Sequence, residues 1–543
     1  MVEKPPPTVK GRGEAFPSFI DLFSGCGGFT LGMLRAGFDC AAAIDFDDNA
    51  ISTLQTNLPS LPNILRRDLT KFRPAELAEL IGRDRIDVIV GGPPCQGFST
   101  ARQVDGANHG ARLTDDPRRH LYREFLKYVD FFQPSVFVIE NVLGIRQAAD
   151  GEYFTRVQHE ARTLGRKHGR AGYRVHAQIE DAAALGVPQK RRRQLIIGVR
   201  ADVPKYFIPE LAPAPTAVVP TTLGDAIGDL PVLRAGSGLN QSEYDPVRRA
   251  NHLSATSRAA RNYLFKVLEI ERATKLSNHV ARPHSERDLR DFARLREGET
   301  SAVAMRERGV KFEFPYDKSS FKDRYTRQSR KGQCSTIVAH LSKDGLMFIH
   351  PTQNRSITPR EAARIQSFPD WFLFPEARTH AFRMIGNAVP PLVAESIGMA
   401  IARFLREIPA RGAKVLEHSA SKRTTMVAKL SILANLKRHH LRAVQKQEFL
   451  EGWQALLSLF PDLHPVNALD HGDKQSVSPE LAHLFPEMEA QERRRYLRSG
   501  WPVAFEVLGR EAWRRRNDGE LSMDEFYGSL GGHGRPAERI STL

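Results

Sequence analysis

From Ser18 to about Val199, short apolar runs rich in β-branched residues alternate with helical stretches, and this alternation narrows the fold to one class. The apolar runs include SFIDLF, IDVIVGG, PSVFVIEN and QLIIGVR, and the helical stretches include FTLGMLRAG and HLYREFLKYVDFF. Strands that alternate with helices form βαβ units, in which a parallel sheet is covered on both faces. We therefore expect an α/β fold with a doubly wound, mostly parallel sheet.

The 543-residue chain divides by composition into further segments. Residues 1–17 are rich in Pro, Gly and charge and are expected to form a flexible lead to the first domain at 18–200. The regular pattern stops in 201–332, which predicts an inserted smaller domain, and returns in 333–408 to complete the first domain. Residues 409–543 combine apolar residues at helical spacing with basic clusters, which predicts a mostly helical C-terminal extension.

Charge and cysteine content bear on partners and environment. The net charge of +16 and the sequence pI near 9.8 favour a polyanionic partner, although an ordinary basic protein is an alternative. Four scattered cysteines without a CxxC pair fit a reducing cytoplasm and give no metal-site spacing. The chain has no run of about 18 apolar residues and no apolar signal-peptide core. We expect a cytoplasmic protein without a membrane segment.

A glycine-rich turn, Asp21–Gly28 (DLFSGCGG), comes where an apolar strand ends and a helix begins. Glycines there let a ligand approach main-chain N–H groups, although a purely structural turn is the alternative. Asp45 ends the next apolar run 20 residues after Gly25, the offset at which doubly wound folds place a carboxylate on ribose hydroxyls. Phe46 follows Asp45, and Asp68 closes the next strand. From these positions the ring of Phe46 can stack on an adenine, and the carboxylate of Asp68 can accept from the adenine amino group. The sequence therefore predicts a nucleotide-like ligand at this turn.

A cysteine stands in the motif Gly91–Ser99 (GGPPCQGFS), directly after the apolar run IDVIV. Ligands of open α/β sheets bind outside the carboxyl ends of strands, so Cys95 is expected at the crevice on a rigid Pro-Pro turn. A thiol displayed there suggests a nucleophile. A buried structural cysteine is the alternative, but the neighbouring Gly, Pro and Gln are poor core material.

Two more motifs place charge at the same sheet edge. The run PSVFVIE brings the Glu140 carboxylate there, and QKRRR precedes the strand QLIIGVR. Alternate residues of a strand share a face, so Arg191 and Arg193 are expected to face the crevice and hold an anion or a carbonyl oxygen. A solvated edge or a phosphate clamp is the alternative for this basic run.

Together these motifs resemble the DNA (cytosine-5) methyltransferase family of bacterial restriction-modification systems. They follow the family order DLFSGCGG, GGPPCQGFS, ENV, QKRRR, RSITPREAARIQSFPDWF and GNAVPP, over about residues 18–200 and 333–406. The resemblance implies the fold of methyltransferases that use S-adenosyl-L-methionine, with this donor as cofactor, no metal, and double-stranded DNA as substrate. It also implies that residues 201–332 form the target-recognition domain.

The donor site that the resemblance implies combines several motifs. Phe23 would lie near the adenine, Asp45 would bind the ribose, Phe46 would stack and Asp68 would read the adenine amino group. The full expected set is Phe23, Ser24, Gly25, Cys26, Gly27, Asp45, Phe46, Asp68, Leu69, Pro94, Leu121, Asn387 and Ala388.

For the base, the resemblance implies Cys95 as nucleophile, Glu140 on the ring N3 and exocyclic amine, and Arg193, supported by Arg191, on the ring O2. The chemistry needs such groups, because cytosine C5 takes a methyl group only after a thiolate has added at C6. A protonated Glu140 would stabilise the charge that develops at N3. The base must also be flipped out of the duplex, since its faces are inaccessible in the stack.

The sequence says less about the residues that recognise DNA bases and about partners other than DNA. Arg324 and Arg327 are candidate base contacts in 201–332, and the positive charge would contact phosphates. The tail at 409–543 departs from compact members of the family. It is equally compatible with DNA binding, dimerisation, a cognate restriction endonuclease as partner, or a stabilising role. We expect a monomer.

Three other functions deserve comparison. The tRNA-methylating branch of the family shares the catalytic motifs but has little between them, unlike 201–332 here. Amino-methyltransferases carry a polar-Pro-Pro-aromatic tetrapeptide where this chain has Pro93, Pro94, Cys95 and Gln96. A non-catalytic DNA-binding regulator of the same fold would not need every functional side chain, all of which are kept. A DNA (cytosine-5)-methyltransferase is therefore the function that the sequence predicts.

Overall fold

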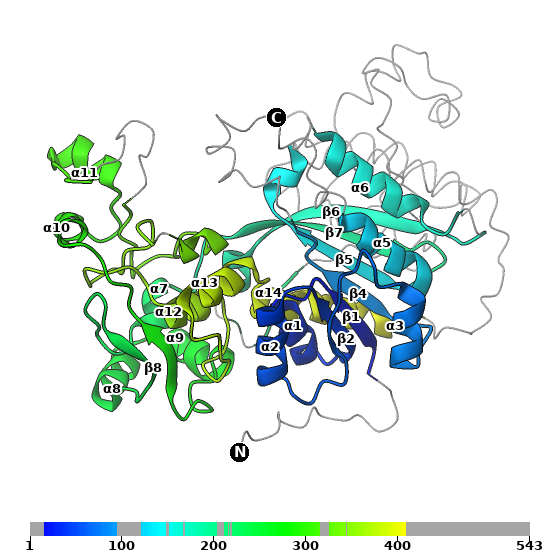
Figure 1. The fold of residues 1–543 in the computed structure, drawn as a ribbon, viewed down its shortest axis with the longest axis horizontal. Coiled ribbons are helices and arrows are strands. Elements are labelled where there is room, and N and C mark those ends of the chain that lie inside the picture. Colours follow the sequence, from blue (N-terminus) through cyan, green and yellow to red (C-terminus); the bar gives the residue numbers. More distant parts are fainter. Residues whose placement is uncertain are drawn as a thin grey trace, which may run out of the picture. The chain divides into compact units, whose positions relative to one another are not determined.

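The computed structural model of the chain describes residues 16–94, 121–147, 151–166, 169–203, 211–215, 217, 220–314, 325–343 and 345–408. The described residues within 1–201 and 208–407 form one compact unit (Figure 1). Cys95, Arg324, most of the expected lead and the extension at 409–543 lie outside the described residues. The division into domains by sequence stays a prediction.

A seven-stranded sheet forms the centre of this unit, in the order β3-β2-β1-β4-β5-β7-β6 (Figure 1). The five strands from β3 to β5 are parallel, whereas β7 runs antiparallel to both β5 and β6. The strands are β1 (Ser18–Leu22), β2 (Asp39–Asp45), β3 (Ile64–Arg66), β4 (Val88–Gly91), β5 (Val136–Asn141), β6 (Tyr173–Asp181) and β7 (Arg192–Arg200). The mostly parallel sheet predicted from the alternating pattern is confirmed.

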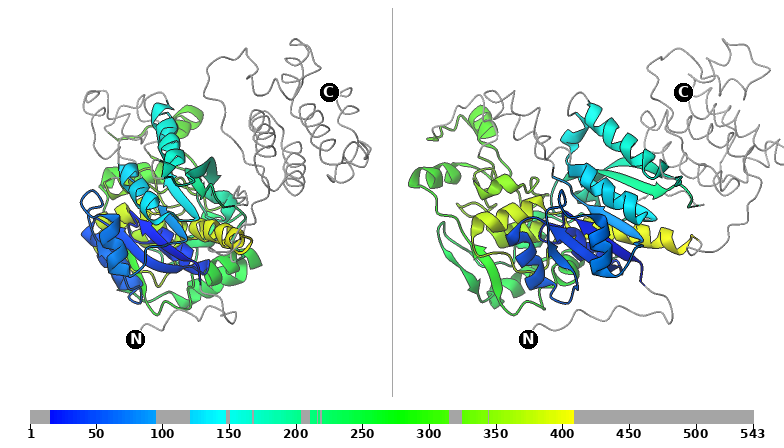
Figure 2. Two further views of the ribbon diagram at one scale, coloured as in Figure 1. Left: turned by 90° about the vertical axis from the view of Figure 1, so that its right-hand side faces the viewer. Right: turned by 45° about the vertical axis from the view of Figure 1, so that its right-hand side comes forward.

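Helices cover both faces of the sheet (Figure 2). They are α1 (Gly28–Arg35), α2 (Asp48–Asn57), α3 (Pro74–Ile81), α5 (Leu121–Phe132), α6 (Glu152–Thr163) and, from the far end of the chain, α14 (Pro391–Arg406), with one-turn helices η4 (Leu143–Arg146) and η7 (Ala182–Leu185). Ile20 and Leu22 of β1 join the apolar core formed with α3, α5 and α6. Asp21, between them, accepts a hydrogen bond from Thr30 of α1. Because adjacent strand residues point to opposite faces, α1 lies on the other face.

Helices α1 and α14 pack against each other, which ties the last described helix to the first. A Cβ atom on Gly32 of α1 would lie 2.4 Å from the Cβ of Ala394 in α14. A residue with a side chain would force these helices apart, so glycine is required for this approach. The last described helix therefore packs directly on the helix that follows β1.

The described residues of 211–349, most of which lie in the segment without a regular sequence period, contain short helices and an antiparallel pair of strands. The elements are α7 (Leu223–Ile227), α8 (Pro246–Ala255), α9 (Arg258–Asn262), η8 (Tyr263–Val267), α10 (Glu286–Arg294), α11 (Ser301–Arg308) and η9 (Ala339–Ser342), with an antiparallel pair of β8 (Gly238–Ser242) and β9 (Leu276–Val280). One apolar cluster joins Phe292, Phe312 and Tyr325 to Leu346 and Ile349. This core contains residues from both sides of residue 333.

Helices α12 (Pro359–Ile365) and α13 (Arg378–Asn387) connect this region to the sheet domain. Helix α12 contacts α7, β9 and α13. Among the described residues, the stretch 378–406 is long and apolar enough to cross a membrane by length and composition alone, but 78% of its apolar window is buried inside the structure. A buried helix of a protein core passes the same test.

Candidate active site

The glycine-rich turn after β1 is held against the end of β2. Phe23, Gly25 and Gly27 have φ angles of 59°, 55° and 92°, a left-handed conformation that favours glycine. The N–H of Gly25 donates to Oδ2 of Asp45 at 2.8 Å, and the N–H of Ser24 donates to the carbonyl of Ile44 at 3.0 Å. The turn and Asp45 therefore meet at the carboxyl edge of the sheet, as the nucleotide-site prediction requires.

Asp45 is mostly buried, and burial raises its pKa although backbone N–H groups of Asp47 and Gly25 oppose the shift. Phe46, next to it, leaves 68% of its surface exposed. Asp68 accepts from the N–H and hydroxyl of Thr70, and the hydroxyl hydrogen bond lowers the pKa of Asp68. Leu69 is buried. An exposed ring that follows a carboxylate in the chain suits a base that stacks on the ring.

Three side chains near the turn are buried. Cys26 is 1% exposed, contacts the carbonyl of Met384 through its sulfur at 3.9 Å, and has a pKa raised to about 12 by burial. The side chain of Cys26 therefore packs inside the protein and is closed to solvent. The hydroxyl of Ser24 and Oδ1 of Asp21 are buried without a hydrogen-bond partner in the described part of the chain. Such orphaned polar atoms beside a glycine turn suit a ligand with hydrogen-bonding groups.

The motif GNAVPP returns to this turn from the end of α13. The contact between Cys26 and Met384 joins positions 358 residues apart. A Cβ atom on Gly28 would lie 2.2 Å from the carbonyl oxygen of Val389, so the two backbones are in close contact. Asn387 is exposed and Ala388 is 9% exposed. The expected convergence of the two ends of the family motifs is therefore present in the structure.

Glu140 and Arg193 form a pair across the last strands of the sheet. Glu140 lies on β5 opposite Leu195 of β7, and Nε of Arg193 lies 3.1 Å from Oε1 of Glu140. Their side chains are 12% and 17% exposed. Oε1 of Glu140 is buried and has no well-aligned hydrogen bond in the described part of the chain. The pair therefore offers a positive group and a carboxylate oxygen that can still accept a hydrogen bond.

The start of the cysteine motif lies against this pair. The side-chain amide of Asn141 donates to the carbonyl of Pro93 at 3.2 Å. A Cβ atom on Gly92 would lie 3.6 Å from Oε2 of Glu140, in ordinary contact. Pro94 is partly buried. Cys95 lies outside the described residues, and the residues that lead to it, Gly92 and Pro93, contact Glu140 and Asn141.

Arg191 differs from the expectation that it faces the crevice with Arg193. It is 2% exposed, and its guanidinium donates to the carbonyls of Ile337, Gly386 and Ala388 at 2.9–3.4 Å. Strand β7 begins at Arg192, so the alternation of faces within a strand does not extend to Arg191. Arg191 thus contacts the backbone of the GNAVPP turn, and Arg193 accompanies Glu140.

Arg327 also differs from its expected role as a base contact. It is 5% exposed, and its guanidinium donates to backbone carbonyls that include those of Phe292, Leu295 and His350. A buried guanidinium with these partners holds the fold of its own region and is not available to a DNA base.

Leu121 begins α5, the first described helix after β4, and is partly buried. A helix that follows a parallel strand starts at the carboxyl edge of the sheet, so Leu121 is placed on the side of the donor turn. The next residue, Tyr122, belongs to the apolar core.

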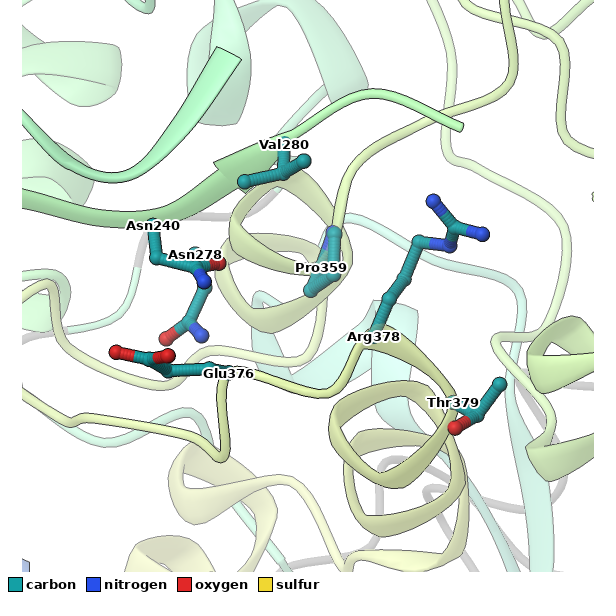
Figure 3. A pocket seen from close by; sticks show the side chains of 7 residues that line it. All are labelled: Asn240, Asn278, Val280, Pro359, Glu376, Arg378 and Thr379. Atoms are coloured by element: carbon teal, nitrogen blue, oxygen red, sulfur yellow. The ribbon is translucent and has the colours of Figure 1, made fainter. Parts of the chain in front are cut away.

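A separate cavity of about 310 Å³ lies in the region of β8 and β9 (Figure 3). Its lining comprises Asn240, Asn278, Val280, Pro359, Glu376, Arg378 and Thr379. Arg378 is the first residue of α13 and Asn387 the last, which puts them about 13 Å apart along the helix. None of the predicted site residues lines this cavity.

The sequence patterns did not identify three buried polar side chains that accompany the predicted site residues. Asp21, Gln189 and Gln366 stand in motifs that were noted, DLFSGCGG, QKRRR and RIQSF, but received no role. An acid or an amide within an apolar motif is the signal that identifies them, because a buried polar group needs specific partners.

Comparison with known proteins agrees with this geometry. Residues 17–403 match the model of the family described as C-5 cytosine-specific DNA methylase. The chain is 34% identical to Type II methyltransferase M.DdeI of Desulfomicrobium norvegicum, over 72% of this chain and 90% of the relative. It is 32% identical to Type II methyltransferase M.XorII of Xanthomonas oryzae, over 74% of this chain and 88% of the relative.

A solved structure gives the same result. A prophage-encoded protein of E. coli, described as a DNA modification methyltransferase, superposes with a TM-score of 0.56 and 29% identity, over 72% of this chain and all of that chain. The family model spans most of the chain, and the relatives are matched over nearly their whole length. Both comparisons assign the chain to the same family. The chain belongs to the C-5 cytosine-specific DNA methylase family and is a DNA (cytosine-5)-methyltransferase.

Proposed function

We propose that this enzyme transfers a methyl group from S-adenosyl-L-methionine to C5 of a cytosine flipped out of a specific duplex DNA sequence. The reaction passes through a covalent adduct between Cys95 and C6 of the base. The enzyme acts as the modification component of a restriction-modification system, a role supported by relatives named as type II methyltransferases.

The observation that carries the proposal is the position of the Glu140–Arg193 pair, with Gly92, three residues before Cys95, in contact with the carboxylate of Glu140. The other three cysteines, Cys26, Cys40 and Cys334, are buried, and burial raises the pKa of each thiol above its ordinary value. A buried thiol that keeps its proton is a poor nucleophile. The nucleophile is therefore assigned to Cys95 by its neighbours and by elimination.

Each side chain has a definite task in this reaction. The Cys95 thiolate forms a bond to C6, and the electron pair of the C5–C6 double bond makes C5 nucleophilic. Protonated Glu140 donates to N3 while its other oxygen accepts from the exocyclic amine, and Arg193 donates to O2. After C5 is methylated, a base removes the C5 proton and the bond from sulfur to C6 breaks, which releases 5-methylcytosine and the thiolate.

The residues around the glycine turn fit S-adenosyl-L-methionine. When bound, it supplies an electrophilic methyl group on a sulfonium. Asp45 would accept from the ribose hydroxyls, the exposed ring of Phe46 would stack on the adenine, and Asp68 would accept from its amino group. The orphaned hydroxyl of Ser24 gives the amino-acid part of the donor a hydrogen-bonding partner.

A Cys95→Ser variant tests the nucleophile. Transfer of a labelled methyl group to duplex DNA should fall by a factor of about 1,000 or more, because a hydroxyl at neutral pH does not add to C6. Donor binding, measured by calorimetry, should persist. Cys40→Ala is the matched control, since Cys40 lies buried at the far end of β2 and should keep most of the activity. Full turnover in Cys95→Ser would refute the assignment.

The target is found by bisulfite sequencing of plasmid DNA from cells that express the protein. The same plasmid should resist an endonuclease that cuts this sequence only when it is unmethylated. A duplex with 5-fluorocytosine at this target should then form a stable adduct, because fluorine cannot leave as the C5 proton does. Absence of an adduct at saturating donor, with ordinary duplexes methylated, would contradict the covalent mechanism.

The proposal also includes a monomer that works in the cytoplasm on the cell's own DNA. Size-exclusion chromatography with light scattering should give a single species of 60.9 kDa. A stable dimer would exclude the monomeric part of the proposal and leave the chemistry untouched.

A further inference from the structure

Two consecutive residues after α12, Gln366 and Ser367, hydrogen-bond to the segment 385–392. This segment contains GNAVPP and is called the donor-site turn. Gln366 and Ser367 are both fully buried. The side-chain amide of Gln366 donates to the carbonyl of Ile385 at 3.0 Å and to that of Ala388 at 2.7 Å. The hydroxyl of Ser367 accepts from the N–H of Leu392 at 3.1 Å.

This clamp, defined as Gln366 and Ser367, is itself fixed by its surroundings. Gln189 donates to the side-chain oxygen of Gln366 and to the carbonyl of Ile365, and its own oxygen accepts from the N–H of Ile337. Ser367 has a φ angle of 63°, which is strained for a residue other than glycine. Such strain persists where the surrounding structure determines the conformation, and it concentrates at functional sites.

The segment that the clamp holds is buried except at one position. From Met384 to Val393, Asn387 alone is exposed. The carbonyls on both sides of Asn387, those of Gly386 and Ala388, also accept from Arg191 at 3.0–3.4 Å. The backbone around Asn387 is thus fixed from two directions while its side chain stays free to meet a ligand.

We propose that Gln366 is a positioning residue for S-adenosyl-L-methionine: its amide fixes the Gly386–Ala388 backbone and thereby the place of Asn387 in the donor site. Gln366 itself does not contact the donor. The proposal rests on the proposed function, because it requires the GNAVPP turn to bind the donor. Loss of the two hydrogen bonds frees the turn and weakens the donor site before the base site.

The test compares Gln366→Glu with a matched control in the full-length chain. Gln328 is also a buried amide, which donates to the carbonyl of Met347 at 2.8 Å and accepts from the N–H of Ser335. Gln328→Glu therefore removes the same kind of contact away from the donor turn. S-adenosyl-L-methionine is titrated calorimetrically into wild type and both variants, about ten degrees below the midpoint of thermal unfolding of each.

The expected result is a Kd for S-adenosyl-L-methionine raised about tenfold or more in Gln366→Glu and less than about twofold in Gln328→Glu. The Kd for duplex DNA, measured without donor, should stay within about twofold in both variants, which separates positioning of the donor from general loss of structure. Gln366→Met, with Gln328→Met as its control, repeats the measurement without introducing a carboxylate.

Three results would overturn the inference. They are an unchanged donor Kd in Gln366→Glu, an equal rise of donor and DNA Kd, and failure of both Gln366 variants to fold while both Gln328 variants fold. If wild type itself binds no S-adenosyl-L-methionine, the donor assignment under the proposed function fails first. If wild type binds the donor and the Gln366 substitutions leave the donor Kd unchanged, only the role of Gln366 is refuted.

Discussion

Asp21, the fourth of the five residues of β1, has a carboxyl group that is completely buried. Burial raises its pKa to about 7, although a hydrogen bond from the hydroxyl of Thr30 at 2.6 Å opposes the shift. Its other oxygen has no partner in the described part of the chain. A buried acid that holds its proton in the folded state makes stability depend on pH.

Substitution Asp21→Asn should therefore make the protein more stable at pH 7.5 but not at pH 3.5. The folded state binds more protons than the unfolded state between the ordinary pKa of 3.8 and the folded value of about 7, so the contribution of Asp21 falls as pH rises through this range. The shift corresponds to a difference on the order of 4 kcal/mol at most. Urea unfolding at pH 3.5, 5.5 and 7.5 measures it.

The gain in stability of the variant over wild type should grow between pH 4 and 7 and then level off. Asparagine keeps an oxygen that can accept from Thr30, so the local hydrogen bond is retained. A difference between variant and wild type that is the same at all three pH values would show that the pKa of Asp21 is the same in the folded and the unfolded state.

At single positions, the sequence predicted which functional residues stand at the ends of strands better than it predicted the residues that they contact. The contact of Asp45 with Gly25 and the pair of Glu140 with Arg193 follow from strands that end at a common edge. Arg191 could not be placed, because its partners are carbonyls of a segment almost 200 residues away. Burial of a guanidinium depends on tertiary contacts that local periodicity does not contain.

At the level of elements, α12 is held by buried arginines. Arg364 donates to both oxygens of Asp370 at 2.8 and 2.5 Å, to Asp229, and to the carbonyl of Ala226 at 3.0 Å. Burial by itself raises the pKa of Asp370, but the charge of Arg364 outweighs it and the net pKa is lowered. These contacts join α12 to the segment after α7 and to the loop that follows α12.

Arg364→Leu should destabilise the fold by about 3–5 kcal/mol, because it removes the guanidinium that the two buried carboxylates share and leaves Asp229 with Arg249 and Asp370 with Tyr244. Arg306→Ala is the control. The ion pair of Arg306 with Glu307 is exposed, and such pairs contribute about 1 kcal/mol or less. Chemical denaturation of both variants gives the comparison, and equal losses would mean that the buried cluster is not a specific support.

The elements of residues 211–349 show where sequence patterns stop being informative. The helices of the sheet domain have an apolar face that repeats with the helical period, and they were predicted closely. Helix α8 has no buried residue, and α7 and α9 have five residues each. Caps and charged contacts stabilise such short elements. Thr222 and Asp225, for example, form a capping box on α7.

On the scale of the whole chain, the family match ends at residue 403 and the compact unit at 407. The described donor and base sites lie within this unit. A chain that ends at Glu407 should therefore remain folded and methylate the same sequence, with kcat within about threefold of the full chain if the extension has no part in the chemistry. Bisulfite sequencing and labelled-methyl transfer check this expectation.

Loss of methylation by a truncated protein that keeps its thermal midpoint would show that residues 409–543 take part in catalysis or DNA binding. Composition could separate this extension from the rest, but it could not supply a role. The convergence of the first and last motifs, by contrast, was predictable from the resemblance and is explained by the packing of α1 on α14.

The donor-site turn belongs to the last helices of the unit, although the strand it faces is made first. A ribosome completes all seven strands of the sheet by residue 200, yet the turn at Gly386–Ala388 is translated almost two hundred codons later. A premature stop codon anywhere in that interval leaves a product without the GNAVPP turn and without α14, the helix that packs on α1. Incomplete translation products are therefore expected to be inert toward the genome of the cell that makes them.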